Sequence, residues 1–311
     1  MSKKQAADFL LAHDDYEILT HANPDGDTLG SGYALCMALQ SLGKNARVIA
    51  SGIPKDFVFL TEGVKSQDFE AATVVSVDVA DEKLLGDFRE AYSGRIALCI
   101  DHHCINKVDA PLKCVYPDAA ANCEILFDIL PMMGVPVAGD IAKCLYTGIA
   151  TDTGCFKYGN TTSRTLRVAA ELLDAGVDAP AINKVMFDTK SKKKLRLEQE
   201  VYSGMEFYAD DRCAIITVTR EMLKNLGATD EDAEGLANLP REIEGVRVGI
   251  TLREKEEGLF KISVRSDSEA NAAALCARFG GGGHIQAAGC TIRGTREEVI
   301  AMLKAAVDEA L

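Results

Sequence analysis

The feature that most restricts the fold of this chain is a set of short runs of apolar and β-branched residues. Thr73–Val77 and Ile96–Ile100 contain no charged residue, which is typical of strands buried on both faces of a parallel sheet. Tyr16–Thr20 and Ala46–Ile49 are also predicted as strands. Between and after these runs, apolar residues recur at helical spacing. Helices are therefore predicted at residues 28–42, 123–130, 141–150 and 163–175. This alternation predicts an α/β fold, a doubly wound and mainly parallel sheet.

The pattern changes near residue 187. A charged helical stretch at 187–208 is predicted to link a first domain, 1–186, to a second, 209–311. In the second domain we expect strands at 213–218, 246–253 and 259–265, and helices at 230–239, 269–278 and 296–310. The second domain is therefore predicted to be a smaller α/β domain.

Charge and composition exclude several classes of protein. The formal net charge of the 311 residues is -13, whereas proteins that grip long nucleic acids by their phosphates usually carry a basic face. The apolar runs are too short to span a bilayer, and the amino terminus does not have the pattern of a signal peptide. The 10 cysteines form no CxxC pair, as expected in a reducing compartment. We expect a cytoplasmic protein without long nucleic acid or a membrane as its partner.

Acidic and histidine side chains gather in four segments: HANPDGD at 21–27, VDVAD at 77–81, DHHCIN at 101–106 and GIATDTG at 148–154. The first three follow predicted strands. Because the carboxyl ends of parallel strands meet at one edge of a sheet, we expect these side chains to converge there. Two imidazoles and four carboxylates in one small space would repel each other without cations. Oxygen and imidazole ligands suit Mn²⁺, Mg²⁺ or Fe²⁺, and their number indicates a pair of ions.

These four motifs, in this order, resemble those of the DHH phosphoesterase superfamily. The segment FGGGGHIQAAG at 279–289 is similar to the signature of the DHH-associated substrate-binding domain. Its glycines allow backbone N–H groups to converge on an anion. The two-domain layout resembles bacterial nanoRNases that are also pAp phosphatases, and stand-alone cyclic-dinucleotide phosphodiesterases. The resemblance covers nearly the whole chain.

The resemblance implies a role for individual residues. Asp78 would bridge two Mn²⁺ ions, with Mg²⁺, Co²⁺ or Fe²⁺ as other possible metals. The remaining metal ligands would be His21 and Asp25 for one ion, and Asp27, His102 and Asp152 for the other. Asp101 would orient a histidine, and His103 would face the phosphate of the substrate. The residues expected to bind substrate are Asn106, which could also brace its loop, Arg265, Ser266, Gly281, Gly282, Gly283 and His284.

The implied activity is hydrolysis of short oligoribonucleotides, including linear dinucleotides such as pApA and pGpG, to 5′-mononucleotides. Removal of the 3′-phosphate of pAp is expected as a second activity, and a homodimer is expected from the resemblance alone. Cleavage of cyclic di-AMP is the first alternative. A nucleotide-sensing protein without turnover is an alternative of another class. An inorganic pyrophosphatase is disfavoured, because such enzymes carry a lysine- and arginine-rich phosphate site in place of FGGGGHIQAAG.

Overall fold

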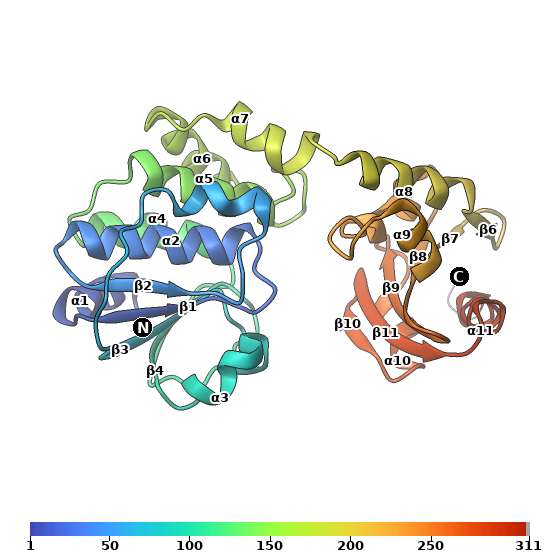
Figure 1. Ribbon diagram of the computed structural model, residues 1–311, viewed down its shortest axis with the longest axis horizontal. Helices are drawn as coiled ribbons and strands as arrows, with labels where there is room; N and C mark the ends of the chain where they lie inside the picture. Colours follow the sequence, from blue (N-terminus) through green and yellow to red (C-terminus); the bar gives the residue numbers. More distant parts are fainter. Residues whose placement is uncertain (309–311) are drawn as a thin grey trace. The chain divides into compact units, whose positions relative to one another are not determined.

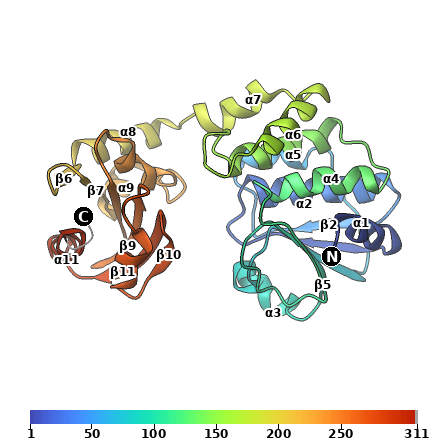
Figure 2. The ribbon, with the colours of Figure 1, turned by 180° about the vertical axis from the view of Figure 1, so that it is seen from behind.

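The computed structural model describes residues 1–308, and the chain divides into two units, Met1–Thr189 and Lys190–Leu311 (Figures 1 and 2). Each unit has a sheet of its own. Within residues 1–308, no helix combines the length and the apolar character that crossing a membrane requires.

The sheet of the first unit has five strands, all parallel, in the order β2-β1-β3-β4-β5. The strands are β1 (Tyr16–Leu19), β2 (Ala46–Ile49), β3 (Thr73–Val77), β4 (Ile96–Asp101) and β5 (Leu112–Val115). The order reverses at β1, which pairs with β2 on one side and β3 on the other. The predicted doubly wound parallel sheet is therefore confirmed, and its switch point lies beside the end of β1, where ligands bind in sheets of this type.

Successive residues of these strands point to opposite faces of the sheet, and both faces are covered. Ile18 and Val75 belong to a core with α2 (Gly26–Ser41), α4 (Asn122–Met132) and α5 (Gly139–Asp152). Their neighbours Leu19 and Val74 belong to a second core under η2 (Glu82–Phe88) and α3 (Arg89–Tyr92). Figure 1 shows α2, α4 and α5 on one side and α3 on the other. The other helices of this unit are α1 (Lys3–Ala12), η1 (Lys55–Thr61), α6 (Ser163–Asp174), α7 (Ala179–Asn183) and η3 (Lys184–Asp188).

Glycines let α2 and α5 pack closely. A Cβ atom on Gly30 would lie 2.5 Å from the Cys144 carbonyl oxygen, and one on Gly26 would overlap the Thr151 side chain. A Cβ atom on Gly148 would lie 2.9 Å from Asp27 Oδ1. Because the start of α2 meets the end of α5, this contact brings Asp27 close to Asp152.

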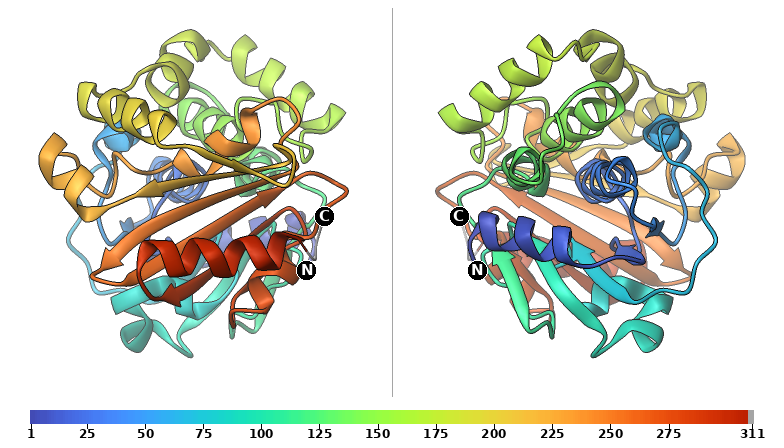
Figure 3. Two further views of the ribbon diagram at one scale, coloured as in Figure 1. Left: turned by 90° about the vertical axis from the view of Figure 1, so that its right-hand side faces the viewer. Right: turned by 90° about the vertical axis from the view of Figure 1, so that its left-hand side faces the viewer.

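The sheet of the second unit is mixed, with the order β10-β11-β9-β8-β7-β6. Only β7 and β8 run parallel to each other among the pairs described. The strands are β6 (Glu206–Tyr208), β7 (Cys213–Val218), β8 (Val248–Glu256), β9 (Leu259–Ser266), β10 (Gly282–His284) and β11 (Ala287–Arg293). One face packs against α10 (Ala272–Ala277) and α11 (Arg296–Asp308), which Figure 3 shows lying across the sheet. The other packs against α8 (Lys192–Ser203), α9 (Arg220–Leu226) and η4 (Leu236–Glu242).

The second unit differs from the sequence prediction in two places, and part of a third element lies outside the described residues. The stretch expected at 187–208 as one linker helix contains the end of the π-helix η3, the α-helix α8 and the strand β6. Leu197 and Val201 of α8 are buried in the core of the second unit. The helix expected at 230–239 is a series of turns followed by the 3₁₀ helix η4, which contains Pro240. Proline removes a backbone donor and disfavours an α-helix there. Residues 309 and 310 of the helix expected at 296–310 lie outside the described residues.

Candidate metal centre

The HANPDGD segment connects β1 to α2 and serves two purposes. Asp25 is the N-cap of α2, and its Oδ1 accepts hydrogen bonds from the backbone N–H groups of Asp27 (3.0 Å) and Thr28 (3.1 Å). Such a cap satisfies donors that the helix leaves unpaired. The other oxygen, Oδ2, lies 3.5 Å from His21 Nε2. The turn thus fixes the carboxylate while leaving one of its oxygens directed at a histidine.

Asp78 lies at the centre of the acidic cluster, directly after β3. It is 3% exposed, its φ is +55°, and its Oδ1 has no hydrogen-bond partner within the described residues. A residue other than glycine pays roughly 1–2 kcal/mol for this left-handed conformation, and an unpaired buried carboxylate oxygen is also costly. His21 Nε2 lies 3.7 Å from Asp78 Oδ2, and His102 Nε2 lies 3.5 Å from Asp78 Oδ1.

A second group surrounds His102. Its Nε2 lies 3.8 Å from Asp27 Oδ2 and 3.6 Å from Asp152 Oδ2. Asp27 is almost fully buried, and its carboxylate also accepts hydrogen bonds from the backbone N–H groups of Asn122 (2.6 Å) and Cys123 (2.9 Å). These are the first two residues of α4, so the positive end of that helix stabilises the carboxylate. Backbone donors leave no mark in the sequence, and this support was not predicted.

His103 is held by Asp101. The Nδ1 atom of His103 lies 2.8 Å from Asp101 Oδ1, and Asn106 Nδ2 donates to Asp101 Oδ2 at 2.7 Å. Asp101 is fully buried, whereas the His103 side chain is 43% exposed. Asn106 Nδ2 also donates to the Val79 carbonyl oxygen at 3.0 Å. The amide nitrogen of Asn106 is thus engaged within the protein, which favours a bracing role over the direct substrate contact that we expected.

Burial and mutual repulsion raise the pKa values of Asp27, Asp78 and Asp152. For Asp25, hydrogen bonds outweigh burial, so the pKa of this carboxyl lies below its usual value. Burial, and then the charge of Asp27, raises the pKa of Asp152 to about 7. The same two causes hold the pKa of Asp78 well above its usual range. Burial lowers the pKa of His102, but the nearby carboxylates of Asp78 and Asp27 outweigh it and raise the pKa to about 10. The cluster thus contains more carboxylate groups than its histidine side chains can neutralise.

The cluster fits a pair of divalent cations. Three overlapping sets of side chains place their ligand atoms within 4.8 Å of one another: His21, Asp25 and Asp78; Asp27, His102 and Asp152; and Asp78, His102 and His103. Asp78 is common to the first and third sets, and His102 joins the third to the second. The unpartnered Oδ1 of Asp78 and the imidazole and carboxylate donors suit Mn²⁺ or Mg²⁺. All six expected metal ligands lie in this cluster.

Residues 17–149 match the DHH family, N-terminal domain, and residues 212–311 match the DHHA1 domain. The bifunctional oligoribonuclease and PAP phosphatase NrnA of Thermus thermophilus is 36% identical over 284 residues, which cover 89% of this chain and 84% of that protein. The chain belongs to the DHH phosphoesterase family.

Solved structures agree with this assignment. An exopolyphosphatase-related protein from Bacteroides fragilis is 27% identical, with a TM-score of 0.89 over 99% of this chain and 96% of that one. The RecJ protein of Thermus thermophilus, solved in complex with Mn²⁺, is 16% identical, with a TM-score of 0.55 over 99% of this chain and 54% of that one. The RecJ protein shares the fold.

In the DHHA1 unit, the expected substrate residues fall into two groups. Ser266 is 1% exposed, and its Oγ lies 3.0 Å from the Ala270 carbonyl oxygen and 3.1 Å from that of Ile285. Ser266 therefore holds two chain segments together, and its contact with substrate stays a prediction. Arg265, at the end of β9, is partly exposed, and its Nε donates to Asn238 Oδ1 at 3.3 Å. His284 is exposed.

The glycine-rich segment is more ordered than the open, anion-binding loop that we expected. Gly282–His284 form the edge strand β10, which pairs antiparallel with β11. A Cβ atom on Gly281 would overlap the Gly289 carbonyl oxygen, and one on Gly283 would lie 2.6 Å from the Ala287 carbonyl oxygen. At these two positions glycine is required because the two strands approach closely. Gly282–His284 are exposed on this edge of the sheet.

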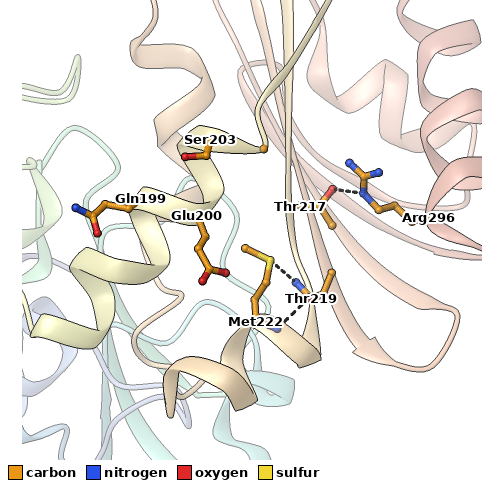
Figure 4. A pocket seen from close by; sticks show the side chains of 8 residues that line it. Gln199, Glu200, Ser203, Thr217, Thr219, Met222 and Arg296 are labelled. Carbon is orange, nitrogen blue, oxygen red and sulfur yellow. Dashed lines mark hydrogen bonds between the residues drawn. The ribbon is translucent and has the colours of Figure 1, made fainter.

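A pocket of about 460 Å³ also lies in the DHHA1 unit, and its walls come from α8, β7, α9 and the start of α11 (Figure 4). Arg296 in this pocket forms an ion pair with Glu206 and donates through Nε to Thr217 Oγ1 at 3.3 Å. The residues that line it include none of those expected to bind substrate: Gln199, Glu200, Ser203, Gly204, Thr217, Thr219, Met222 and Arg296.

Proposed function

We propose that this DHH phosphoesterase uses Mn²⁺ to hydrolyse short oligoribonucleotides, including pApA and pGpG, to 5′-mononucleotides, and removes the 3′-phosphate of pAp. The observation that carries the proposal is the convergence of His21, Asp25, Asp27, Asp78, His102 and Asp152 around a buried carboxylate oxygen without a partner. RecJ of Thermus thermophilus was solved with Mn²⁺ and also with Mg²⁺, which supports a divalent cation in this fold. The ten free cysteines support a reducing location, and we place the activity in the cytoplasm.

Two observations support a short substrate. The name of the Thermus thermophilus relative assigns oligoribonucleotides and PAP to that protein. The net charge of -13 does not favour a long basic groove. A small phosphate-bearing ligand needs only a few local donors, and Arg265, His284 and the backbone of β10 are the groups that we assign to this task. A second copy of the chain remains an expected partner.

In this mechanism the chain's own residues hold and orient the reacting groups. Two divalent cations, when bound by the cluster, activate water and offset charge on the phosphoryl oxygens. Asp101 fixes the ring of His103 through Nδ1, so that Nε2 of the protonated ring can donate to a phosphoryl oxygen. Asn106 holds the other oxygen of Asp101. Asp27 is fixed by the first turn of α4, so one ligand is held in place before any ion binds.

The experiment that tests this function is a panel of substrates at matched concentration with Mn²⁺. The panel contains pApA, a five-nucleotide RNA, a twenty-four-nucleotide RNA, pAp and cyclic di-AMP. We expect rapid hydrolysis of pApA, the five-mer and pAp, and slow hydrolysis of the twenty-four-mer. Preferred hydrolysis of cyclic di-AMP would replace this proposal with a signalling phosphodiesterase. Nucleotide binding without turnover, unchanged by metal removal, would indicate a sensor.

Arg265→Ala tests the contribution of the DHHA1 unit. We expect the KM for pApA to rise about 10-fold with little change in kcat, because the arginine binds a part of the substrate that does not react. Steady-state kinetics on pApA measure both constants. Arg212→Ala, which alters a partly buried arginine that donates to the Ala209 carbonyl oxygen, is the control and should leave KM unchanged. A fall in kcat alone would contradict the assignment of Arg265.

A further inference from the structure

Tyr158 presents an exposed aromatic ring close in sequence to the metal centre. Its side chain is 53% exposed. The chain reaches it through three consecutive residues with positive φ: Gly154 at +55°, Cys155 at +58° and Phe156 at +64°. Residues other than glycine rarely adopt this conformation, and two in succession are strained. Strain of this kind gathers at functional sites, and here it follows directly after α5, which ends at Asp152.

One face of the Tyr158 ring lies against the backbone of Gly154. A Cβ atom on Gly154 would overlap the ring atoms Cζ, Cε1 and Cε2, so the α-carbon of this glycine faces the ring. The Tyr158 N–H donates to the Thr153 carbonyl oxygen at 3.0 Å, which fixes the start of the side chain. The protein therefore covers one face of the Tyr158 ring. The solvent-exposed area of the ring lies on its other face and its edges.

The segment that carries Tyr158 is tied to the candidate ligand Asp152. Asn160 Nδ2 donates to the Asp152 carbonyl oxygen at 3.2 Å and to the Ala120 carbonyl oxygen at 3.0 Å. Gly154, beneath the ring, is two residues from Asp152, so their α-carbons are at most about 7.6 Å apart. The ring thus packs on a residue that follows the candidate ligand Asp152 by two positions in the chain.

We propose that Tyr158 binds a nucleobase of the substrate by stacking and thereby determines specificity for nucleotides over other phosphoesters. This inference rests on the proposed function and adds a base-binding residue to it. An aromatic ring with one supported face offers the other to any of the four bases, because every base has a π-face. Stacking of this kind tolerates sequence differences, as an enzyme for short RNA of mixed sequence requires.

The test compares wild type, Tyr158→Ala and Tyr158→Phe on pApA and on two analogues, each lacking one of the two bases. On pApA, Tyr158→Ala should raise KM about 10-fold with kcat unchanged within about twofold, as expected for loss of one stacked base. Tyr158→Phe keeps the ring and should resemble wild type. On the analogue without the stacked base, wild type and Tyr158→Ala should have the same KM.

Two controls separate stacking from a merely structural role. Mn²⁺ titration of Tyr158→Ala should match wild type, which shows that Asp152 is still in place. Tyr202→Ala removes a 44% exposed tyrosine of α8 and should leave KM unchanged. If Tyr158→Ala raised KM equally on pApA and on both analogues, or left KM unchanged on pApA, the stacking role would be overturned. A wild-type protein inactive on pApA would overturn the proposed function as well.

Discussion

At the scale of single residues, the candidate site combines the expected metal ligands with residues that fix the position of a neighbouring side chain. Asp78 has a positive φ, and within the described residues its buried Oδ1 atom has no hydrogen-bond partner. Asp101 differs, because both of its oxygens are engaged, one by His103 and one by Asn106. The two aspartates thus have different hydrogen-bonding environments, and these environments determine the role that we expect for each carboxylate.

Asp101→Asn tests the orientation of His103. Asparagine keeps the shape but offers only one oxygen, so it cannot accept from both His103 and Asn106. We expect kcat on pApA to fall about 10- to 100-fold, as for other residues that orient a functional histidine, while Mn²⁺ binding is retained. Asp81→Asn is the matched control, because Asp81 caps η2 through the Lys83 N–H. Equal activity in the two variants would contradict this role for Asp101.

At the scale of helices and strands, the sequence predicted the elements whose burial produces a clear pattern of apolar residues. The apolar runs 73–77 and 96–100 are β3 and β4, and the segments after them contribute to the cluster as expected. The strands β5 and β11 were not predicted. Leu112–Val115 contains a lysine and is mostly half-buried, so it lacks a clear period. The glycines near β11 obscured its alternation of buried and less buried positions.

The supports of the site were also hidden from sequence reasoning. Asp27 depends on the backbone of Asn122 and Cys123, and Asp152 is contacted through its carbonyl oxygen by Asn160. Backbone groups occur at every position, so only the packing of α2, α4 and α5 selects these particular ones. The expected metal ligands could be predicted from the sequence because aspartate and histidine gather in a few short segments. The contacts that fix these side chains depend on tertiary structure and could not be predicted.

Gly148→Ala tests the packing of α2 against α5. The added Cβ would overlap Cys123 Sγ and lie 2.9 Å from Asp27 Oδ1. We expect the free energy of unfolding to fall by about 1–3 kcal/mol, as in other overpacked cores, together with weaker Mn²⁺ binding. Thermal unfolding and Mn²⁺ titration measure these effects. Gly204→Ala, whose Cβ would meet the Glu200 carbonyl oxygen at 3.4 Å, should change neither. Unaltered stability in Gly148→Ala would show that the helices can separate without cost.

At the scale of the whole molecule, the acidic cluster links metal binding to stability. In the metal-free folded protein the pKa of Asp152 is about 7, above its unfolded value of about 3.9. The stability that this proton contributes is present below about pH 4 and lost as the pH rises towards 7. The pKa of His102 is about 10 in the folded protein, so its contribution is lost as the pH rises from about 6.5 towards 10.

Metal should therefore stabilise the protein more at higher pH. Cations offset the ionised carboxylates and require them deprotonated, so binding strengthens as protons leave. We expect the difference in Tm between Mn²⁺-loaded and chelator-treated protein to be larger at about pH 8 than at about pH 5.5. Differential scanning calorimetry at the two pH values measures it. A difference that shrinks with rising pH would mean that the cluster does not bind the metal.

The central claim is a pair of metal ions joined by Asp78, and titration of the metal-free protein with Mn²⁺ tests it most directly. Wild type should bind two ions per chain. Asp78→Asn keeps the shape of the side chain but removes its charge, and it should bind Mn²⁺ at least about 10-fold more weakly at both positions and lose hydrolysis of pApA. One ion per chain in wild type, or two ions bound with unchanged affinity by Asp78→Asn, would rule out a pair of metal ions joined by Asp78.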